Sequence, residues 1–491
     1  MVMPPPRTLY MRSQASPRVV CFSTSAPPQG RRVGDQPVTK VVKDVTTMSS
    51  NLYLTTTGPA AGKSAIVLGL MSLLERETRD VGFFRPIGRH EAGATTALDP
   101  NVGLICSVFG IDCQPEAMIG VTDREATDLI TSGRYEELIE RILTAYKAYE
   151  RTRGFVLVEG TNYQGPTVPF EFDINADIAR NLGAPVLLVV SGRERNAEDI
   201  YDNAILSRDA FEQRGCDLLA VIANRVDPNS LDEVKDLLAE RLVAAKIPFA
   251  GAIPEEQILA KPRMDEIATA LDAEVLYGEQ YLDNLVFDFK IGSMQLLSLL
   301  DRVEPGALVI TAGDRADVLL GLMAAQMSNR TPNLSGLLLS SGLKPTETLD
   351  RVVKGLRDTR LPVLAVPTGA FQTAINVSHV ASTITPRSFR KIETARILFE
   401  QHVDTHVLRS GISMARPERL TPTLFLHGLI ERARADRRHI VLPEGSEERI
   451  LRAVDALLRR HVAEITMLGD EEEIRDRAQK LNVDLAGVHV V

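Results

Sequence analysis

Short apolar runs alternate with amphipathic stretches along the chain from residue 51 onward. The runs are rich in Val, Ile and Leu and have the length of strands that are buried on both faces of a sheet. We predict strands at Asn51–Thr56, Phe155–Val158, Pro185–Val190, Leu218–Ile222, Ala307–Thr311, Leu334–Leu339, Pro362–Val366 and His439–Leu442. Helical patterns lie between several of them, as at Leu231–Ala245 and Thr348–Arg357. Strands that alternate with helices indicate parallel sheets covered by helices, so the predicted fold class is α/β with several domains.

Length and charge limit the kind of protein further. The chain has 491 residues, and at roughly 100–200 residues per domain this length suggests three domains, with two or four as alternatives. It has 56 Lys and Arg against 65 Asp and Glu, a net charge of -9, and no Trp. Such a mildly acidic chain is a poor candidate for binding nucleic acid or a membrane surface. Its apolar runs also fall short of the roughly 18 residues that a membrane-spanning helix needs.

The spacing of the four cysteines indicates whether the chain resides in a reducing or an oxidising compartment. Cys21, Cys106, Cys113 and Cys216 are scattered and form no C-x-x-C pair. This spacing argues against a disulfide scaffold and against a cysteine zinc site, and it fits a reducing compartment. A cytoplasmic location is therefore predicted.

Residues 1–47 differ in composition from the rest. They are rich in Pro, Ser and Arg and carry no acidic residue before Asp35. A segment of this kind cannot bury enough apolar surface to offset the cost of ordering, so we predict a disordered extension. An Arg- and Ser-rich, acid-poor start resembles an organelle transit peptide over residues 1–34. The alternative, which we favour, is a dispensable extension, since Met48 stands directly before the first predicted strand.

The sharpest chemical motif runs from Thr57 to Ser64, with the sequence Thr-Gly-Pro-Ala-Ala-Gly-Lys-Ser. It follows a predicted strand and opens a predicted helix, Ser64–Arg76, which is the setting of a phosphate-binding loop. In such a loop Gly58 and Gly62 let the backbone approach the phosphates, Lys63 reaches the terminal phosphates and the Ser64 hydroxyl holds Mg²⁺. The usual first glycine is replaced by Thr57, so a strand-to-helix turn without a nucleotide is the alternative.

Two strand ends support the loop. Glu159 follows the strand Phe155–Val158, and a carboxylate at the carboxyl end of a buried strand can bind Mg²⁺ directly or through water. Asn224 follows the strand Leu218–Ile222, where its amide can donate to and accept from the edge of a nucleobase. A solvated acid at a strand end is the alternative for Glu159.

Together these motifs resemble the dethiobiotin-synthetase-like P-loop domains. The loop is followed by Val158-Glu159-Gly160-Thr161, Ala223-Asn224-Arg225 and Gly251-Ala252-Ile253-Pro254, in the order of that family. The resemblance implies ATP binding by Lys63 and Ser64, metal binding by Ser64 and Glu159, and adenine recognition by Asn224.

Two later segments narrow the resemblance. Thr311–Val318, which contains Asp314-Arg315, looks like the module named for an Asp-Arg-Thr-Gly-Gly signature, but Ala316-Asp317-Val318 replaces the Thr-Gly-Gly. We therefore prefer the interpretation that Asp314 caps the helix that follows. Leu424–Arg434 and His439–Val454, with the Pro443-Glu444-Gly445 turn and Arg449, look like the opening of a phosphate acetyltransferase catalytic domain. The order of the three segments is that of the long-form, multidomain bacterial phosphate acetyltransferases.

The resemblance implies four regions. They are an extension at 1–47, a P-loop domain at 48–255, the Asp-Arg module at 256–412, and a linker with an incomplete start of the acyltransferase domain at 413–491. In that family an Asp, a Ser and an Arg deep in the catalytic domain perform the chemistry. The chain stops before those positions, so no catalytic residue is assigned, and we expect a fragment that is inactive alone.

The implied reaction is acetyl-CoA plus phosphate to acetyl phosphate plus CoA. The implied partners are these small molecules, with no tightly bound cofactor, Mg-ATP as an effector, and a homo-oligomer in the full-length form. No nucleic acid or membrane partner is expected. The alternative function is a nucleotide-binding sensor or an ATP-dependent ligase built on the P-loop domain.

Overall fold

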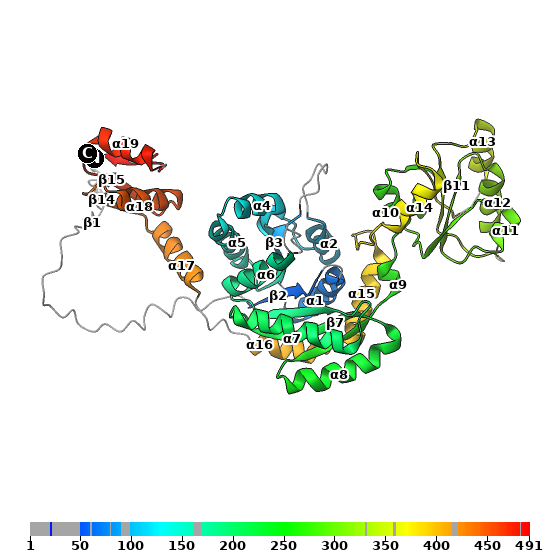
Figure 1. Cartoon of the computed structure of the whole chain (residues 1–491), viewed down its shortest axis with the longest axis horizontal. Coiled ribbons are helices and arrows are strands. Elements are labelled where there is room, and N and C mark those ends of the chain that lie inside the picture. Colours follow the sequence, from blue (N-terminus) through cyan, green and yellow to red (C-terminus); the bar gives the residue numbers. More distant parts are fainter. Residues whose placement is uncertain are drawn as a thin grey trace, which may run out of the picture. The chain divides into compact units, whose positions relative to one another are not determined.

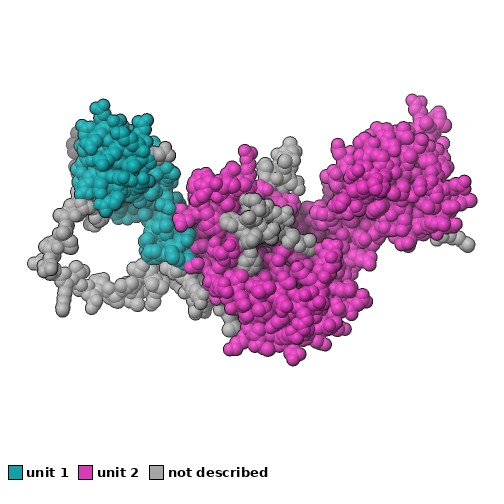
Figure 2. All heavy atoms as spheres, viewed as in Figure 1, with its two compact units in different colours: residues 1–48, 419–491 teal, residues 49–418 magenta. Residues whose placement is uncertain are grey.

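The computed structural model describes residues 20–21, 50–58, 61–78, 80–89, 99–161, 168–328, 331–356, 360–414, 421–481 and 483–491. The predicted extension 1–47 lies outside the described residues except for β1 (Val20–Cys21). The chain divides into two compact units, one of residues 49–418 and one of residues 1–48 with 419–491 (Figure 2). Among the helices of these described stretches, none combines the length and apolar character that crossing a bilayer requires.

A seven-stranded parallel sheet with the order β4-β3-β5-β2-β6-β7-β8 forms the first half of the unit 49–418. Its strands are β2 (Ser50–Thr56), β3 (Val81–Gly88), β4 (Ile119–Thr122), β5 (Phe155–Glu159), β6 (Val186–Ser191), β7 (Leu218–Val226) and β8 (Phe249–Pro254). Burial of β5 along its whole length explains the continuous apolar run that predicted it.

Helices flank this sheet (Figure 1). They are α1 (Lys63–Glu77), α2 (Pro100–Phe109), α3 (Pro115–Met118), α4 (Asp123–Thr131), α5 (Tyr135–Glu150), α6 (Val168–Leu182), α7 (Ala197–Gln213), the short η3 (Pro228–Ser230) and α8 (Leu231–Ala244). The predicted parallel α/β fold class is confirmed.

Strand β3 was absent from the strands predicted from the sequence. It contains Arg85 and Pro86, which interrupt the apolar pattern, and proline is rare inside a central strand. The strand pairs with β5 through Val81–Phe84 and with β4 from Arg85 onward. Pro86 therefore lies beyond the part of β3 that pairs with β5, where its missing N–H does not interrupt that pairing.

A second, five-stranded sheet with the order β10-β11-β12-β13-β9 follows, and it is parallel except for β9. Its strands are β9 (Glu274–Tyr277), β10 (Asp288–Ile291), β11 (Ala307–Ala312), β12 (Gly336–Ser340) and β13 (Val363–Ala365). The neighbouring helices are α9 (Gln257–Ala260), α10 (Met264–Ala270), η4 (Glu279–Tyr281), α11 (Leu296–Leu300), α12 (Ala316–Gln326), α13 (Glu347–Gly355) and α14 (Ala370–Ser378). Alternate residues of β11 enter two different apolar clusters, so both faces of the sheet are buried.

The chain then returns to the first sheet. Helices α15 (Phe389–His402) and α16 (Thr405–Met414) belong to the region predicted as the Asp-Arg module, yet α15 packs against α1 and β8, and α16 packs against β7. A side chain at Gly69 would overlap the ring of Phe399, so the absence of a Cβ permits this close packing. The packing of 389–414 thus differs from the predicted division of the chain, because the amphipathic pattern of a helix does not identify the sheet that it covers.

The remaining unit contains a small parallel sheet with the order β1-β14-β15-β16. Its elements are α17 (Pro422–Ala435), β14 (Arg438–Leu442), α18 (Glu448–Arg459), β15 (Ala463–Met467), α19 (Glu471–Lys480) and β16 (His489–Val490). Leu451, Ile465 and Ile474 are almost fully buried and form the centre of its apolar core.

Candidate functional site

The loop after β2 has the backbone of an anion-binding turn. Gly62, the N-cap of α1, has φ 77° and ψ 32°, a left-handed conformation that favours glycine. A Cβ at this position would lie 2.5 Å from Nδ2 of Asn224. Gly58 has open space around it, and the hydroxyl of Thr56 donates to its carbonyl oxygen at 3.1 Å. The first N–H groups of α1 therefore open onto a turn that only glycine fits at residue 62.

Lys63 and Ser64 begin α1. Lys63 is 7% exposed, and its Nζ donates to the carbonyl oxygen of Gly160 at 2.5 Å. The hydroxyl of Ser64 donates to Oδ1 of Asn101 at 3.2 Å. The loop lysine is thus anchored at the end of β5, beside the predicted acid Glu159.

Glu159 is a fully buried carboxylate with strong partners. Its Oε1 lies 3.0 Å from the guanidinium of Arg85. The side-chain amide of Asn101 donates to both carboxylate oxygens, at 2.9 and 3.0 Å. Burial by itself lowers the pKa of Arg85, but Glu159 and Asp99 outweigh it and hold that pKa above its ordinary value. Arg85 is therefore a fixed positive charge inside the site.

Asp99 sets the position of Asn101. It is the N-cap of α2, and its carboxylate accepts from the backbone N–H of Asn101 and of Val102 at 2.9 and 3.2 Å. The same carboxylate accepts from the N–H of Arg89 at 2.8 Å. The cap holds the first turn of α2 against β3, so that the amide of Asn101 reaches both Ser64 and Glu159.

The geometry of Ser64 and Glu159 does not fit the metal predicted for them. A divalent cation needs lone pairs that face it, and both oxygens of Glu159 face N–H donors of Arg85 and Asn101. The Asn101 amide also lies between the two predicted ligands, since it bonds to each of them. No group of three or more His, Cys, Asp or Glu side chains suited to a metal occurs among the residues that the structure describes.

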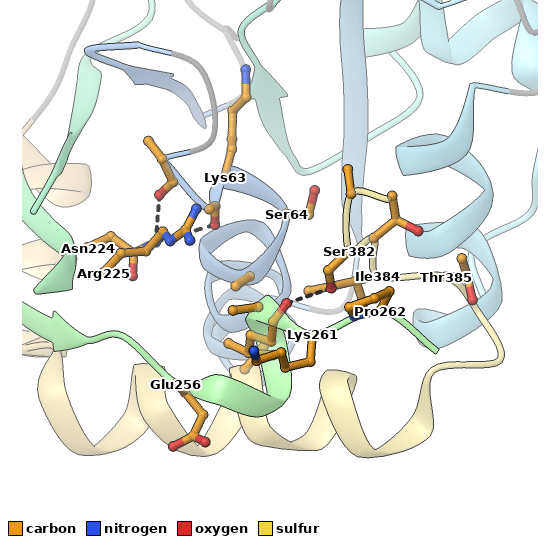
Figure 3. Close-up of a pocket in the computed structure, with 18 of the residues that line it drawn as sticks. Lys63, Ser64, Asn224, Arg225, Glu256, Lys261, Pro262, Ser382, Ile384 and Thr385 are labelled. Carbon is orange, nitrogen blue, oxygen red and sulfur yellow. Dashed lines mark hydrogen bonds between the residues drawn. The ribbon is translucent and has the colours of Figure 1, made fainter. Parts of the chain in front are cut away.

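Asn224 lies at the edge of the same loop. Its Nδ2 donates to the carbonyl oxygen of Ala61 at 2.7 Å (Figure 3). The next residue, Arg225, has a left-handed φ of 64° and pairs with Glu255 at 2.5 Å. Asn224 therefore supports the loop backbone, and its role toward a base stays a prediction.

All the predicted site residues line one cavity of about 1260 Å³. Gly58, Gly62, Lys63, Ser64, Glu159 and Asn224 line it together with Arg85 and Asn101. Segments 256–262 and 377–386 line it as well, and Figure 3 shows Lys261, Pro262, Ser382 and Thr385 beside the loop residues. The cavity is large enough for a nucleotide-sized ligand.

The second predicted motif differs from expectation. Helix α12 begins with Arg315 as its N-cap and has no side-chain cap, so the suggestion that Asp314 caps it is wrong. The guanidinium of Arg315 forms two contacts of 2.8 Å with Asp317, within the first turn of the helix. The chain turns at Gly313 and Asp314 before the helix starts, which shifts the cap by one residue.

Sequence reasoning missed Arg85, Asp99 and Asn101. The run Asp99-Pro100-Asn101 carried a usable signal, because Asp before Pro is a frequent helix start. Arg85 carried no such signal, since a single arginine in an apolar stretch does not reveal its partner. Each of these residues became recognisable only when the sheet brought β3, α2 and β5 together.

Three family models match successive parts of the chain. The model described as "AAA domain" matches residues 50–263, "DRTGG domain" matches 266–380, and "Phosphate acetyl/butaryl transferase" matches 424–491. The three matches occur in the order that the sequence motifs indicated.

Several curated proteins are similar over most of the chain. A phosphate acetyltransferase of Nitratidesulfovibrio vulgaris is 40% identical over 448 residues, which is 90% of this chain and 63% of that protein. A phosphate acetyltransferase of Synechocystis is 33% identical over 445 residues, 89% of this chain and 62% of that protein. One of Salmonella typhimurium is 25% identical over 474 residues, 90% of this chain and 64% of that protein. The chain thus spans less than two thirds of the length of these relatives.

Solved structures add little. The MinC:MinD cell division protein complex of Aquifex aeolicus matches with a TM-score of 0.26 and 16% identity, over 43% of this chain and 84% of that chain. A likeness at this level carries no argument about function.

Proposed function

Because the chain resembles the multidomain phosphate acetyltransferases over about 90% of its length, we propose that it serves the reaction of acetyl-CoA with phosphate to give acetyl phosphate and CoA. The observation that carries this proposal is the order of the three matched regions along one chain. Acetyl-CoA, CoA and phosphate are then its substrates. A homo-oligomer in the cytoplasm is part of the same proposal, and the free thiols of Cys106, Cys113 and Cys216 support a reducing compartment.

Acetyl transfer needs groups that we do not assign. In the direction of acetyl-CoA synthesis the CoA thiol attacks the acetyl carbon, which requires a base, a donor for the oxyanion and a cation for the leaving phosphate. The described part of the phosphate-acetyltransferase-like region, residues 421–481 and 483–491, supplies three short strands and a surface groove lined by Glu444, Ser446, Glu447, Arg449 and Arg477. We expect the 491-residue chain by itself to lack turnover.

The test measures phosphate-dependent release of CoA from acetyl-CoA. It is run on the 491-residue chain and on the longest polypeptide that its gene encodes, with the phosphate acetyltransferase of Nitratidesulfovibrio vulgaris as positive control. We expect turnover by the longest polypeptide. Absence of turnover there would overturn the proposal, whereas turnover by the 491-residue chain would overturn only the expectation that it is inactive alone.

We infer a second function for residues 50–263, the binding of a nucleoside triphosphate as an effector. The supporting observation is the glycine turn at Gly62 beside the buried cations Lys63 and Arg85, in a cavity of nucleotide size. Gly58, Gly62, Lys63 and Ser64 would hold the phosphates, and Asn224 would hold the loop in shape. We favour a sensor over a ligase, because the sequence shows no signature of a pocket for a second substrate.

Calorimetric titration with ATP tests this function. Lys63→Ala removes a charge-assisted contact worth about 1.5–3 kcal/mol, so we expect the affinity to fall by roughly tenfold to hundredfold. Lys354→Ala is the control, because Lys354 is an exposed lysine of α13 that pairs with Asp350. Equal affinity of wild type and Lys63→Ala would show that the loop is not the binding site.

A further inference from the structure

A guanidinium occupies the charged centre of the nucleotide site. Arg85 is 4% exposed, and it lines the cavity together with Lys63 and Ser64. Its Nη1 lies 3.0 Å from Oε1 of Glu159, and its Nε lies 3.5 Å from Oδ2 of Asp99. That Nε is buried and has no hydrogen-bond partner among the described residues. Arg85 thus places a buried positive charge at the cavity, held between the carboxylates of Glu159 and Asp99.

The carboxylate that a metal would need is already occupied. Both oxygens of Glu159 accept from the amide of Asn101, and one of them also faces Arg85. Asn101 is held in this orientation, because its Oδ1 accepts from Ser64 and the Asp99 cap fixes its backbone. A cation that approached Glu159 would meet N–H groups and a positive charge about 3 Å from the same oxygen, where like charges repel strongly in a buried site.

The charges of the site also balance without a metal. Arg85 and Lys63 carry positive charge, and Glu159 and Asp99 carry negative charge, and all four side chains are more than nine-tenths buried. Binding of a polyphosphate adds negative charge next to the two cations Lys63 and Arg85. In the absence of a metal, Lys63 and Arg85 are therefore the positive charges that the phosphates would meet.

We propose that Arg85 takes the place of a divalent cation in this site, so that the loop binds a metal-free polyphosphate anion, with ATP as the probe. The proposal rests on the nucleotide binding inferred above and names the form in which the nucleotide is bound. Arg85 is fixed by Glu159 and Asp99, as a metal would be fixed by its ligands, and Lys63 supplies the second positive charge.

The first experiment compares ATP binding by the 491-residue chain in EDTA and in excess MgCl₂, by calorimetry. We expect binding in EDTA to be at least as tight as in MgCl₂, because excess Mg²⁺ converts ATP into its magnesium complex and lowers the concentration of the metal-free anion. A loss of affinity in EDTA of more than about tenfold would overturn the proposal while leaving nucleotide binding intact. Absence of binding in both buffers would instead overturn the nucleotide binding on which the proposal rests.

Two substitutions give opposite predictions in EDTA. Arg85→Gln should weaken binding by about tenfold or more, because it removes a buried cation beside the ligand. Glu159→Gln should strengthen binding by roughly threefold to tenfold, because the charge of Arg85 is then less neutralised. If Glu159 were a metal ligand, Glu159→Gln would weaken binding in MgCl₂ instead, which would overturn the proposal.

The controls separate this effect from loss of folding. Arg214→Gln removes an arginine of the same unit that pairs with Asp173 and Asp177, at 2.7 and 3.1 Å, outside the cavity lining. It should bind ATP like wild type in both buffers. Arg85→Lys keeps the charge if Arg85→Gln fails to fold, and it should retain more metal-free binding than the double variant Arg85→Gln/Glu159→Gln. Wild-type affinity of that double variant in EDTA would contradict a role for Arg85.

Discussion

The two large sheets each contain a strand, a glycine turn and a helix, and only one of these turns has the surroundings of an anion site. After β2, the turn at Gly62 is approached by a donor, Nδ2 of Asn224, and it opens into the cavity. After β11, a Cβ at Gly313 would overlap the carbonyl oxygen of Leu343. The carbonyl oxygen of Leu343 carries partial negative charge and would repel an anion, whereas the amide nitrogen of Asn224 would not. The element that covers the turn, more than the turn itself, decides whether a phosphate can bind.

The charged pairs beside the two turns differ in the same way. Arg85 and Glu159 are 4% and 0% exposed, whereas Arg315 and Asp317 are 29% and 53% exposed. Buried ions interact more strongly with a ligand than solvated ions do, because water screens the latter. The charges beside the first turn are therefore buried at the cavity, whereas those beside the second turn form a solvent-exposed pair.

Gly62→Ala should have the largest effect, because it should remove the ATP binding that distinguishes the first turn from the second. The new Cβ meets Asn224 and the residue must keep a left-handed φ, so ATP affinity should fall by about hundredfold in calorimetry. Gly110→Ala is the matched control, since Gly110 also has a positive φ, 62°, but has open space around it. Both variants should lose about 1–2 kcal/mol of stability, and only Gly62→Ala should lose binding. Equal ATP affinity of the two variants would contradict the role of the turn.

Gly313→Ala, at the second turn, should lower the stability of the fold without changing ATP binding. Overlap with the Leu343 carbonyl should lower the free energy of unfolding by about 1–3 kcal/mol in urea denaturation, with ATP affinity unchanged. Gly355→Ala, where nothing lies near the new Cβ, is the control and should be neutral or stabilising by up to about 1 kcal/mol. An unchanged free energy of unfolding for Gly313→Ala would contradict the close contact between Gly313 and the Leu343 carbonyl.

The smallest expected effect concerns pH. Hydrogen bonds from Arg315 lower the pKa of Asp317 from 3.8 to about 2. A lowered pKa in the folded chain means that the stabilisation is complete above the unfolded value and is lost as the pH falls through about 2. Because the pair is exposed, it should contribute less than about 1 kcal/mol. Carboxyl NMR titration of wild type should give the low pKa of Asp317, and Arg315→Gln should return that pKa toward 3.8. An unchanged pKa in Arg315→Gln would show that the pair is not formed in solution.

Much of the fold was predictable from local pattern. The buried strands β5 and β6 follow their apolar runs, and α8 begins at the predicted residue and ends one residue before the predicted Ala245. β3 was not predictable, because Arg85 and Pro86 break its apolar pattern and its burial depends on neighbours from elsewhere in the chain. The packing of α15 against α1 also escaped prediction, because a helix pattern specifies an apolar face without specifying its partner.

The candidate site likewise has one part that the sequence indicated and another that only the tertiary structure revealed. The sequence by itself indicated the glycine turn with Lys63 and Ser64 at the start of a helix, since these residues lie within one short segment. Only the tertiary structure decided the partners of Glu159, because Asn101 is 58 positions away along the chain and Arg85 lies on a different strand. Local sequence fixes backbone conformation, but the environment of a buried charge depends on which distant side chains surround it. That physical difference is the reason why the glycine turn was visible from the sequence and the buried arginine beside Glu159 was not.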